Sequence, residues 1–496
     1  MSKFGDSIKN LKEKLFGSDK KSLQTTPPEA KQHDQIHPIK AKISSPQPKR
    51  NPHFVQIGFD FGTAYSKCLC RDVMIDKAWV HIPSHPADQM LPFLIPSIVF
   101  LKDGHLTACS NSSSHYPENG LYHLKQALEK VALEQWDDEA LAPYKRCAGD
   151  AESDDRSIIR LVEDCATYFL AGAIGDVRRQ VSQRLKGFGE HPDDYIAINL
   201  AVPVADAQRP QVNELYHKVL CQAWILSDQL AGHPPIHLNE LNSLLEHHCG
   251  NIDSSVRECC YIYPEVSANV QGFVRSRASR QGMYLFSDTG AGTVDQSVFI
   301  FLRENEGERL AYLHGSVLSL GSSFIERIAT EMKHGQYDWQ VLEQLRKDKE
   351  SGAISPPLVN ARMKICRELD RGTTATIALA RRKLFNKDQI RSISVIFGGG
   401  GHCENPYKLG VISPFSGNLF SPDVVPDVVG VPDPIDLELN ASHKGWLPRL
   451  SVAYGLSFVK SELARFIYPI DISNPTPEEL WRPSSSVVEA AAKEFC

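Results

Sequence analysis

The chain carries one short pattern twice, with about two hundred residues between the copies, and this duplication limits the folds open to it. In the first copy, VQIGFDFGTAYSKCLCRD, apolar residues from Val55 to Phe59 lead into Asp60. In the second, YLFSDTGAGTVDQSVFIF, a similar apolar run leads into Asp288. A glycine, small hydroxyl residues and a second β-rich stretch follow each aspartate. We therefore predict two hairpins whose turns each combine one carboxylate with bare backbone.

Turns of this composition are typical of phosphate-binding loops. Glycine lets backbone N–H groups approach an anion closely, and the hydroxyls of Thr63 and Thr293 add donors. Two such loops facing each other would hold a polyphosphate from both sides. Asp60 and Asp288 would then hold a hydrated magnesium ion, which needs few protein ligands. The chain lacks both G-x-x-x-x-G-K-[ST] and G-x-G-x-x-G, which excludes a P-loop and a Rossmann dinucleotide site.

A third glycine-rich motif, SVIFGGGGHCENPY, lies in the last quarter of the chain. It predicts a buried strand around Val395, then four glycines, then a helix that begins near Pro406. Bare backbone at residues 399–401 would let a flat, bulky group such as a nucleoside lie against the chain.

These three motifs, in this order, resemble the actin-like ATPase superfamily, and their details are similar to the nucleotide-binding domain of 70-kDa heat-shock proteins. Four more segments agree with that domain, and the collinear match runs from about residue 54 to about residue 468: INLAVPVADAQRPQV, YPEVSANV, VLSLGSSFIER and SVAYGLSF. The resemblance implies an α/β, two-lobed actin-like (ribonuclease H-like) fold with nucleotide in the cleft between the lobes. It also implies a chaperone-like protein that binds ATP or ADP with Mg²⁺, slowly hydrolyses ATP and switches the state of a partner protein.

The resemblance assigns roles to individual residues. The expected catalytic residues are Asp288, Asp295, Glu265 and Lys125, although Lys125 could equally be an ordinary solvated helix lysine. The expected metal ligands are Asp60 and Asp288. The expected nucleotide-binding residues are Gly62, Thr63, Ala64, Gly290, Ala291, Gly292, Thr293, Gly321, Ser322, Lys364, Arg367, Gly399, Gly400 and Gly401. For contact with adenine or ribose, Lys364, Arg367 and Arg371 remain open alternatives.

The chain departs from the family pattern close to the expected phosphates. Ala291 stands between two glycines where the family has three glycines, and Ala64 stands where a hydroxyl is common. Lys67 is an unusual residue after Ser66, and it would either add a cation near phosphate or face solvent.

Composition and charge divide the chain into segments. Residues 1–52 hold 11 Lys and Arg against 5 Asp and Glu, whereas the whole chain has a net charge of -6. We predict a disordered basic tether there, because Pro, Gln, Ser and Lys dominate it. Phe4, Ile8, Leu11 and Leu15 share one helical face near its start. This short helix would dock on a partner or an acidic membrane surface, or be a frayed terminus.

We expect ATPase lobe I over 53–280 with a helical insertion at about 228–258, and lobe II over 281–449. A closing helix of lobe I is expected over 450–470, and a short tail over 471–496. The segment TTATIALA, at 373–380, is predicted to be a strand. The tail is too short for the peptide-binding domain of the chaperones, so we expect a divergent member that lacks it.

The remaining composition favours a cytoplasmic protein. No apolar run approaches the roughly 18–20 residues that span a bilayer, the start of the chain lacks an apolar signal core, and twelve scattered cysteines fit reduced thiols. The negative charge argues against general nucleic-acid binding. Three alternative functions remain open: an actin-like polymerising ATPase, a small-molecule kinase or phosphatase of the same superfamily, and a pseudo-ATPase that uses nucleotide only as a structural ligand.

Overall fold

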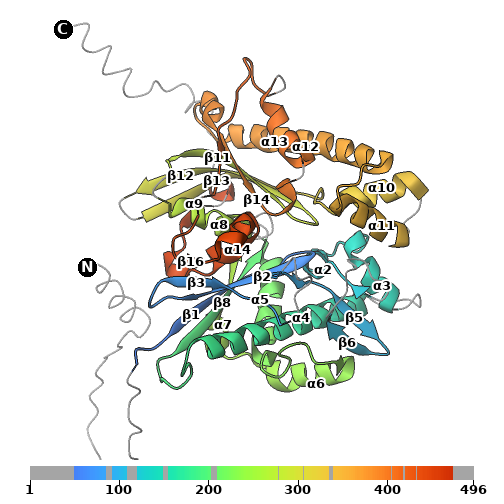
Figure 1. Cartoon of the computed structure of the whole chain (residues 1–496), viewed down its shortest axis with the longest axis vertical. Coiled ribbons are helices and arrows are strands. Elements are labelled where there is room, and N and C mark those ends of the chain that lie inside the picture. The colour runs from blue at the N-terminus through green and yellow to red at the C-terminus, as the bar shows by residue number, and fades with distance from the viewer. Residues whose placement is uncertain are drawn as a thin grey trace, which may run out of the picture. The chain divides into compact units, whose positions relative to one another are not determined.

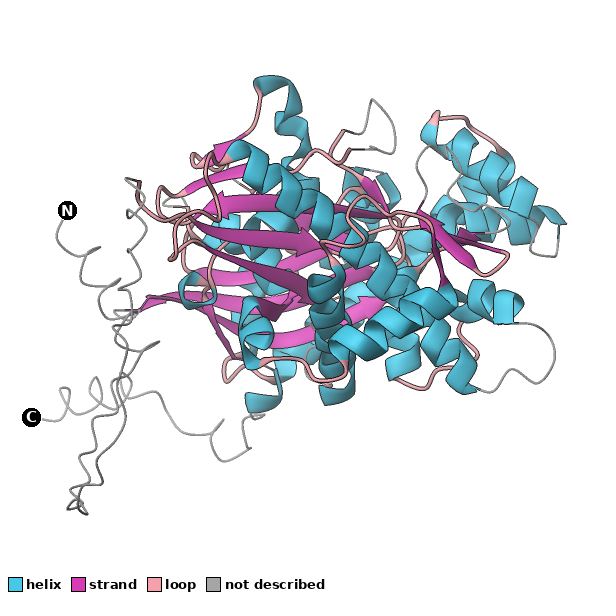
Figure 2. Cartoon of the chain, turned by 90° about the horizontal axis from the view of Figure 1, so that it is seen from below, coloured by secondary structure: helices cyan, strands magenta, loops and turns pink. Residues whose placement is uncertain are grey.

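The computed structural model describes most of the chain between residues 50 and 472. The described ranges are 50–84, 92–108, 120–148, 155–202, 209–276, 279–304, 307–334, 339–403, 405–416, 419–431, 433–467 and 469–472. Nearly all of the expected tether (1–52) and tail (471–496) lies outside them. The predicted α/β class is confirmed, since mixed sheets carry helices on their faces (Figures 1 and 2). No helix in these ranges is both long and apolar enough to cross a membrane.

The first mixed sheet contains the first predicted hairpin. Its strand order is β10-β8-β1-β2-β3-β16, with β4 paired to β2. The bounds are β1 (Phe54–Asp60), β2 (Tyr65–Asp72), β3 (Lys77–Val80), β4 (Ile95–Pro96), β8 (Tyr195–Val202), β10 (Cys260–Pro264) and β16 (Leu437–Glu438). The pairs β1–β2 and β2–β3 are antiparallel. The pairs β1–β8, β8–β10 and β3–β16 are parallel.

The second mixed sheet repeats this arrangement strand for strand. Its order is β15-β14-β11-β12-β13-β17. The bounds are β11 (Gly282–Thr289), β12 (Val294–Glu304), β13 (Gly307–Leu318), β14 (Ser394–Gly398), β15 (Val428–Val429) and β17 (Arg465–Ile467). Again the first three strands form an antiparallel meander, and the other three pair in parallel at corresponding places. The duplication seen in the sequence therefore extends to whole sheets.

A small third sheet, β7-β5-β6-β9, lies in the first half of the chain. Its strands are β7 (Gly120–Leu121), β5 (Val99–Lys102), β6 (His105–Ala108) and β9 (Ile236–His237). Strand β9 leads into α6 (Leu238–Cys249) and α7 (Ser254–Cys259), which occupy the segment where an extra helical insertion is expected.

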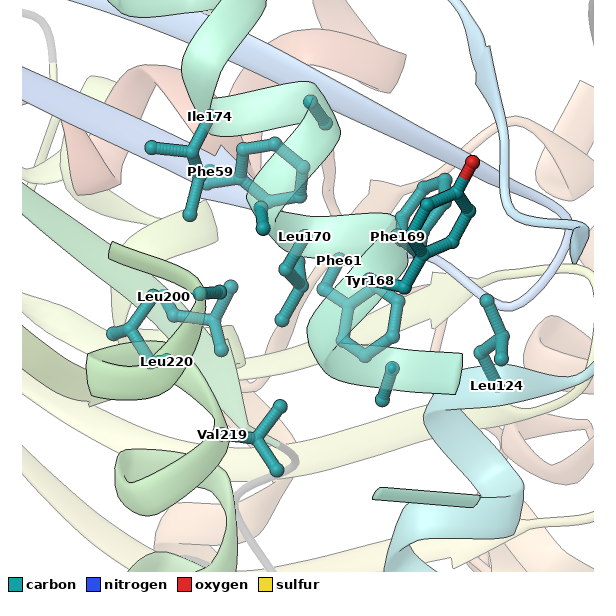
Figure 3. Packing of buried hydrophobic residues seen from close by; sticks show 14 of the residues in the cluster. Phe59, Phe61, Leu124, Tyr168, Phe169, Leu170, Ile174, Leu200, Val219 and Leu220 are labelled. Carbon is teal, nitrogen blue, oxygen red and sulfur yellow. The ribbon is translucent and has the colours of Figure 1, made fainter. Parts of the chain in front are cut away.

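Helices cover one face of the first sheet and bury its strands. They are α2 (Leu124–Ala132), α3 (Ala142–Ala148), α4 (Asp155–Arg184) and α5 (Pro210–Leu226). Figure 3 shows side chains of β1 meeting those of α4, and Leu200 of β8 lying near Val219 and Leu220 of α5. The rings of Phe61 and Phe169 stack with their centroids 5.8 Å apart. This apolar packing fixes the end of β1, where Asp60 lies.

One face of the second sheet is covered by α12 (Pro356–Arg382). Helices α10 (Phe324–His334) and α13 (Asn405–Ile412) pack on α12, and α11 (Trp339–Glu350) packs on α10. Helix α13 begins beside Pro406, as expected. The strand predicted at 373–380 is wrong, because this segment is the last part of α12. Buried Leu369, Thr373 and Ile377 continue the four-residue spacing of one helical face, and this packing outweighs the β-preference of threonine and isoleucine.

The other faces of the two sheets are covered by helices from the opposite half of the chain. Helices α8 (Glu265–Asn269) and α9 (Gln271–Val274) follow β10 of the first sheet but pack on the second sheet, against residues such as Phe286. Helix α14 (Leu447–Leu456) follows the strands of the second sheet but packs on the first. All three lie between the sheets (Figure 1).

The closing helix expected over 450–470 is shorter than predicted. Helix α14 ends at Leu456, and the chain returns to the second sheet as β17. The ring of Phe466, in β17, packs edge-on against Tyr263 with centroids 5.6 Å apart. Burial of this aromatic side chain favours the extended segment over more helix.

Candidate functional site

A cavity of about 910 Å³ lies where the turns of the two hairpins meet. Most of the residues selected from the sequence line it: Asp60, Gly62, Thr63, Ala64, Lys125, Glu265, Asp288, Gly290, Ala291, Thr293, Asp295, Ser322, Gly399, Gly400 and Gly401. They come from both mixed sheets and from α2 and α8. The volume is in the usual range for small-molecule sites, about 300–1,000 Å³.

Two of the selected glycines, Gly292 and Gly321, are not among the lining residues and serve packing instead. A Cβ on Gly321 would lie 2.3 Å from the carbonyl oxygen of Ala291. The Gly321 N–H donates to the carbonyl of Gly292 over 3.2 Å, and the Ser322 N–H donates to that of Gly290 over 2.9 Å. The 321–323 loop therefore braces the turn of the second hairpin.

The basic residues selected on α12 do not line the cavity. Lys364, Arg367 and Arg371 share an exposed stripe of the helix. Arg362 lines the cavity instead. Successive helical side chains turn by about 100°, so residues 362 and 364 point in nearly opposite directions. Helix α12 therefore reaches the cavity through Arg362 and not through the residues selected from the sequence.

The two hairpins bring their aspartates to the cavity in the same register. In the first, Asp60 of β1 is paired with Lys67 of β2. In the second, Asp288 of β11 is paired with Asp295 of β12. Asp60 is only 2% exposed and Asp288 6%. Corresponding positions of the duplicated hairpins therefore face the same space.

Each buried carboxylate has a polar partner. Lys67 Nζ lies 2.6 Å from Asp60 Oδ2, and Lys125 Nζ lies 2.5 Å from Glu265 Oε2. Asn269 donates from its amide to Asp288. The Thr293 hydroxyl donates to Asp295 Oδ2 over 2.9 Å. Four carboxylates and two ammonium groups thus share one end of the cavity.

This crowding shifts the pKa values of the group. Burial, together with the nearby carboxylates of Glu265 and Asp60, raises the pKa of Asp288 to about 7. Burial also raises the pKa of Asp295 well above its ordinary value. Burial opposes the charge of Lys125, but Glu265 and Asp60 outweigh it and raise the lysine's pKa. Lys125 is therefore a buried, charged residue and not a solvated helix lysine.

The Gly399–Gly401 loop lies directly against the second hairpin. Gly399 has a φ of +74°, which favours glycine, and a Cβ there would lie 2.2 Å from Asp288 Oδ1. A Cβ on Gly401 would lie 2.5 Å from the methyl carbon of Thr289. Bare backbone is therefore required at Gly399 and Gly401 for packing against the second hairpin, whereas the sequence prediction concerned contact with a nucleoside.

Several polar lining residues were missed in the sequence. They are His123, Glu326, Lys349, Arg362, Asn405 and Arg449. Lys349 donates to Glu326 Oε2 over 2.7 Å and to the carbonyl of Ser322 over 2.8 Å. Burial, with Arg327 nearby, lowers the pKa of His123 to about 3, so that its ring is neutral near pH 7. Glu326 and Asn405 lie within two of the segments selected from the sequence, VLSLGSSFIER and SVIFGGGGHCENPY. The other four belong to no recognisable motif, and only the fold brings them to the cavity.

Comparison with known proteins assigns no family. No model of a known protein family matches the chain, and no curated protein matches it significantly. Within the described part of the chain, no group of three or more His, Cys, Asp and Glu side chains is arranged to hold a metal ion.

Proposed function

We propose that the chain is a chaperone-like ATPase of the actin-like type, which binds ATP and acts as a slow nucleotide-driven switch for a partner protein. One observation carries the proposal: two sheets with six corresponding strands each present the turn of their first hairpin, with its aspartate, to one cavity. A duplicated, two-lobed fold with nucleotide between the lobes is what the sequence resemblance implies.

The lining of the cavity suits a polyphosphate. The turns at 62–64 and 290–293 offer backbone N–H groups and the hydroxyls of Thr63 and Thr293. The Gly399–Gly401 loop and Arg362 lie in the same lining, on the second sheet and its helix. We assign the two turns to the β- and γ-phosphates, and the loop with Arg362 to the nucleoside.

The donor set fits a hydrated magnesium ion. Asp288 would hold it through water, since Mg²⁺ keeps several of its waters and needs few carboxylates. Such an ion would neutralise charge on the phosphates. Asp60, the other expected ligand, is already paired with the ammonium of Lys67.

Hydrolysis would depend on the buried carboxylates. Phosphoryl transfer needs positioning and charge neutralisation more than covalent chemistry. Asp288, with a pKa of about 7, can accept a proton from water near neutral pH. Lys125, held by Glu265, supplies a fixed positive charge beside it. We assign Asp288 the role of orienting and polarising the attacking water, with Asp295 and Glu265 in support.

The crossing helices offer a route from the site to a partner. Glu265 is the first residue of α8, which directly follows β10 of the first sheet and packs on the second sheet. Arg449 and Pro448, at the start of α14, also line the cavity. A change in the bound phosphates would therefore act on both connections and alter how the two sheets close around the nucleotide.

Calorimetry and thermal unfolding with ATP, ADP and GTP test the binding. We expect ATP to raise the melting temperature, because a ligand that binds only the native state stabilises it by RT ln(1 + [L]/Kd), about 2.7 kcal/mol at one hundred times Kd. Single-turnover hydrolysis then distinguishes an ATPase from a pseudo-ATPase, and sedimentation with ATP identifies a filament former. A folded protein that binds no nucleotide at millimolar concentration would refute the proposal.

A further inference from the structure

The duplicated hairpins carry opposite charges at one corresponding position. Asp60 and Asp288 occupy the same place in the two sheets, at the ends of β1 and β11. The residue paired with Asp60 is Lys67, whereas the residue paired with Asp288 is Asp295. One half of the site therefore has a positive charge built into the strand where the other half has a carboxylate.

The strand holds Lys67 in this place. Its neighbours Ser66 and Cys68 are fully buried on the opposite face of β2, and the Ser66 hydroxyl lies 2.9 Å from that of Ser97. The Lys67 side chain is 18% exposed, lines the cavity and reaches Asp60 over 2.6 Å. It therefore faces the site and not bulk solvent.

We propose that Lys67 supplies, at Asp60, the positive charge that a divalent cation would otherwise supply, so that the site binds nucleoside polyphosphates with little dependence on magnesium. This inference rests on the proposed function and deepens it. An ammonium has three donors, so Lys67 can keep its bond to Asp60 and donate to a phosphate oxygen as well.

The position of the ammonium disfavours a metal ion at the same carboxylate. A cation bound at Asp60 would lie close to Lys67 Nζ, and like charges at such a distance repel strongly in a partly buried site. Asp288 has no ammonium paired with it in its hairpin and keeps its place for a water-mediated ion. Magnesium would therefore strengthen binding through Asp288 of the second hairpin, while Lys67 provides the positive charge in the first hairpin.

Calorimetric titration with ATP, in excess magnesium and in excess EDTA, tests this inference on the wild-type chain. We expect the two dissociation constants to differ by less than about threefold. In Lys67→Met, which keeps the length of the side chain, affinity in EDTA should fall about tenfold or more, the usual effect of losing a charge-assisted hydrogen bond. Magnesium should restore part of that loss, and Lys67→Arg, which keeps the charge, should resemble wild type.

Lys77→Met is the matched control, because Lys77 is an exposed strand lysine of the same sheet. It should bind ATP like wild type in both conditions. Wild-type binding that requires magnesium would overturn the inference and leave the proposed function standing. Equal affinities of wild type and Lys67→Met in EDTA would also overturn it. A folded wild type that binds ATP in neither condition would overturn both the inference and the proposed function.

Discussion

Asp288 combines burial, crowding by carboxylates and a position on the cavity wall. Burial with Glu265 and Asp60 nearby raises its pKa to about 7, so it can exchange a proton near neutral pH. Asn269 and Gly399 contact the carboxylate and fix its orientation. Asp295 is also buried with a raised pKa, but Asp288 is the aspartate that follows the apolar run of the duplicated motif. Asp288 is therefore the residue on which to test catalysis.

We predict that Asp288→Asn lowers single-turnover ATP hydrolysis about 10²–10³-fold, the usual cost of removing one preorganised electrostatic group. Its effect on ATP affinity should be much smaller, because binding is shared among many backbone N–H groups of both turns. Rapid-quench hydrolysis and calorimetry on the same preparation measure the two effects. The exposed Asp228→Asn is the control. Equal hydrolysis in Asp288→Asn and wild type would contradict the assigned role.

A second carboxylate with a raised pKa, Asp164, does not line the cavity. Asp164, in α4, is 5% exposed, and burial raises its pKa to about 7. In the unfolded chain an aspartate has its ordinary pKa, near 4. Between these values the folded state binds more protons than the unfolded state, so this group lowers stability as pH rises from about 4 to about 7.

We predict that Asp164→Asn removes this dependence and raises the free energy of unfolding at pH 8 by about 2 kcal/mol, with a smaller gain at pH 5. Urea unfolding of both proteins across this pH range measures the difference. Parallel pH profiles would show that Asp164 does not carry the effect.

At the scale of elements, the sequence identified those whose local pattern matches their packing. The two hairpins follow from apolar runs that lead into an aspartate and a glycine-containing turn, the strand before Gly399 follows from an apolar run that ends in glycine, and Pro406 marks the start of the next helix. The segment 373–380 was predicted wrongly as a strand. Its residues Thr373 and Thr376 are β-branched, which favours a strand, but they are buried on one face of α12. Local preference was misleading there, since helix packing decides the structure of a half-polar segment.

Arg362, Lys349 and Arg449 line the cavity but could not be predicted from the sequence. They lie on three different helices, and no neighbouring glycine or regular spacing distinguishes them from other basic residues. Arg449 approaches the glycine loop so closely that a Cβ on Gly400 would lie 2.8 Å from its Nε. Such contacts come from the placement of α12, α11 and α14 around the cavity, which is a long-range property of the fold.

The fit of α14 depends on glycine. A Cβ on Gly455 would lie 1.8 Å from the carbonyl oxygen of Ala268 in α8, and one on Gly58 would lie 2.2 Å from that of Ala453 in α14. Backbone atoms cannot move aside as a flexible side chain can. The helix is therefore held between β1 and α8 with no room for a methyl group.

We predict that Gly455→Ala lowers the free energy of unfolding by about 3 kcal/mol, at the upper end of overpacking costs. Gly430→Ala is the control, because a Cβ at Gly430 meets nothing within 4 Å. Chemical denaturation compares the two variants with wild type. Equal stability of the two variants would show that α14 can shift away from α8 at little cost.

At the scale of the whole chain, the two halves exchange elements. Strand β16 lies at the edge of the first sheet although its sequence follows the strands of the second. Arg71, fully buried in β2, pairs with Asp436 over 2.6 Å just before β16, and its guanidinium lies 3.8 Å from the centroid of Phe458. The sequence shows no sign of this exchange between the halves. Boundaries drawn at residues 280 and 449 therefore do not separate the residues of the first sheet from those of the second.

The start of the described chain is itself tied to the first sheet. Arg50 Nη1 donates to Asp194 Oδ1 over 2.8 Å, and the backbone N–H of His53 donates to the same oxygen over 2.8 Å. The guanidinium holds the pKa of Asp194 well below its ordinary value. The contribution of residues 50–52 can therefore be separated from that of the basic segment before them.

We predict that removing residues 1–49 leaves thermal stability and ATP binding unchanged, because the composition of that segment cannot build a core. Removing residues 1–52 should lower the melting temperature by a few degrees, since Asp194 then loses its guanidinium partner and part of its hydrogen bonding. Scanning calorimetry of the two truncations beside the full chain measures this step, and Arg50→Gln in the full chain should reproduce most of it. If the shorter truncation is already unstable or no longer binds ATP, residues before 50 contribute to the fold.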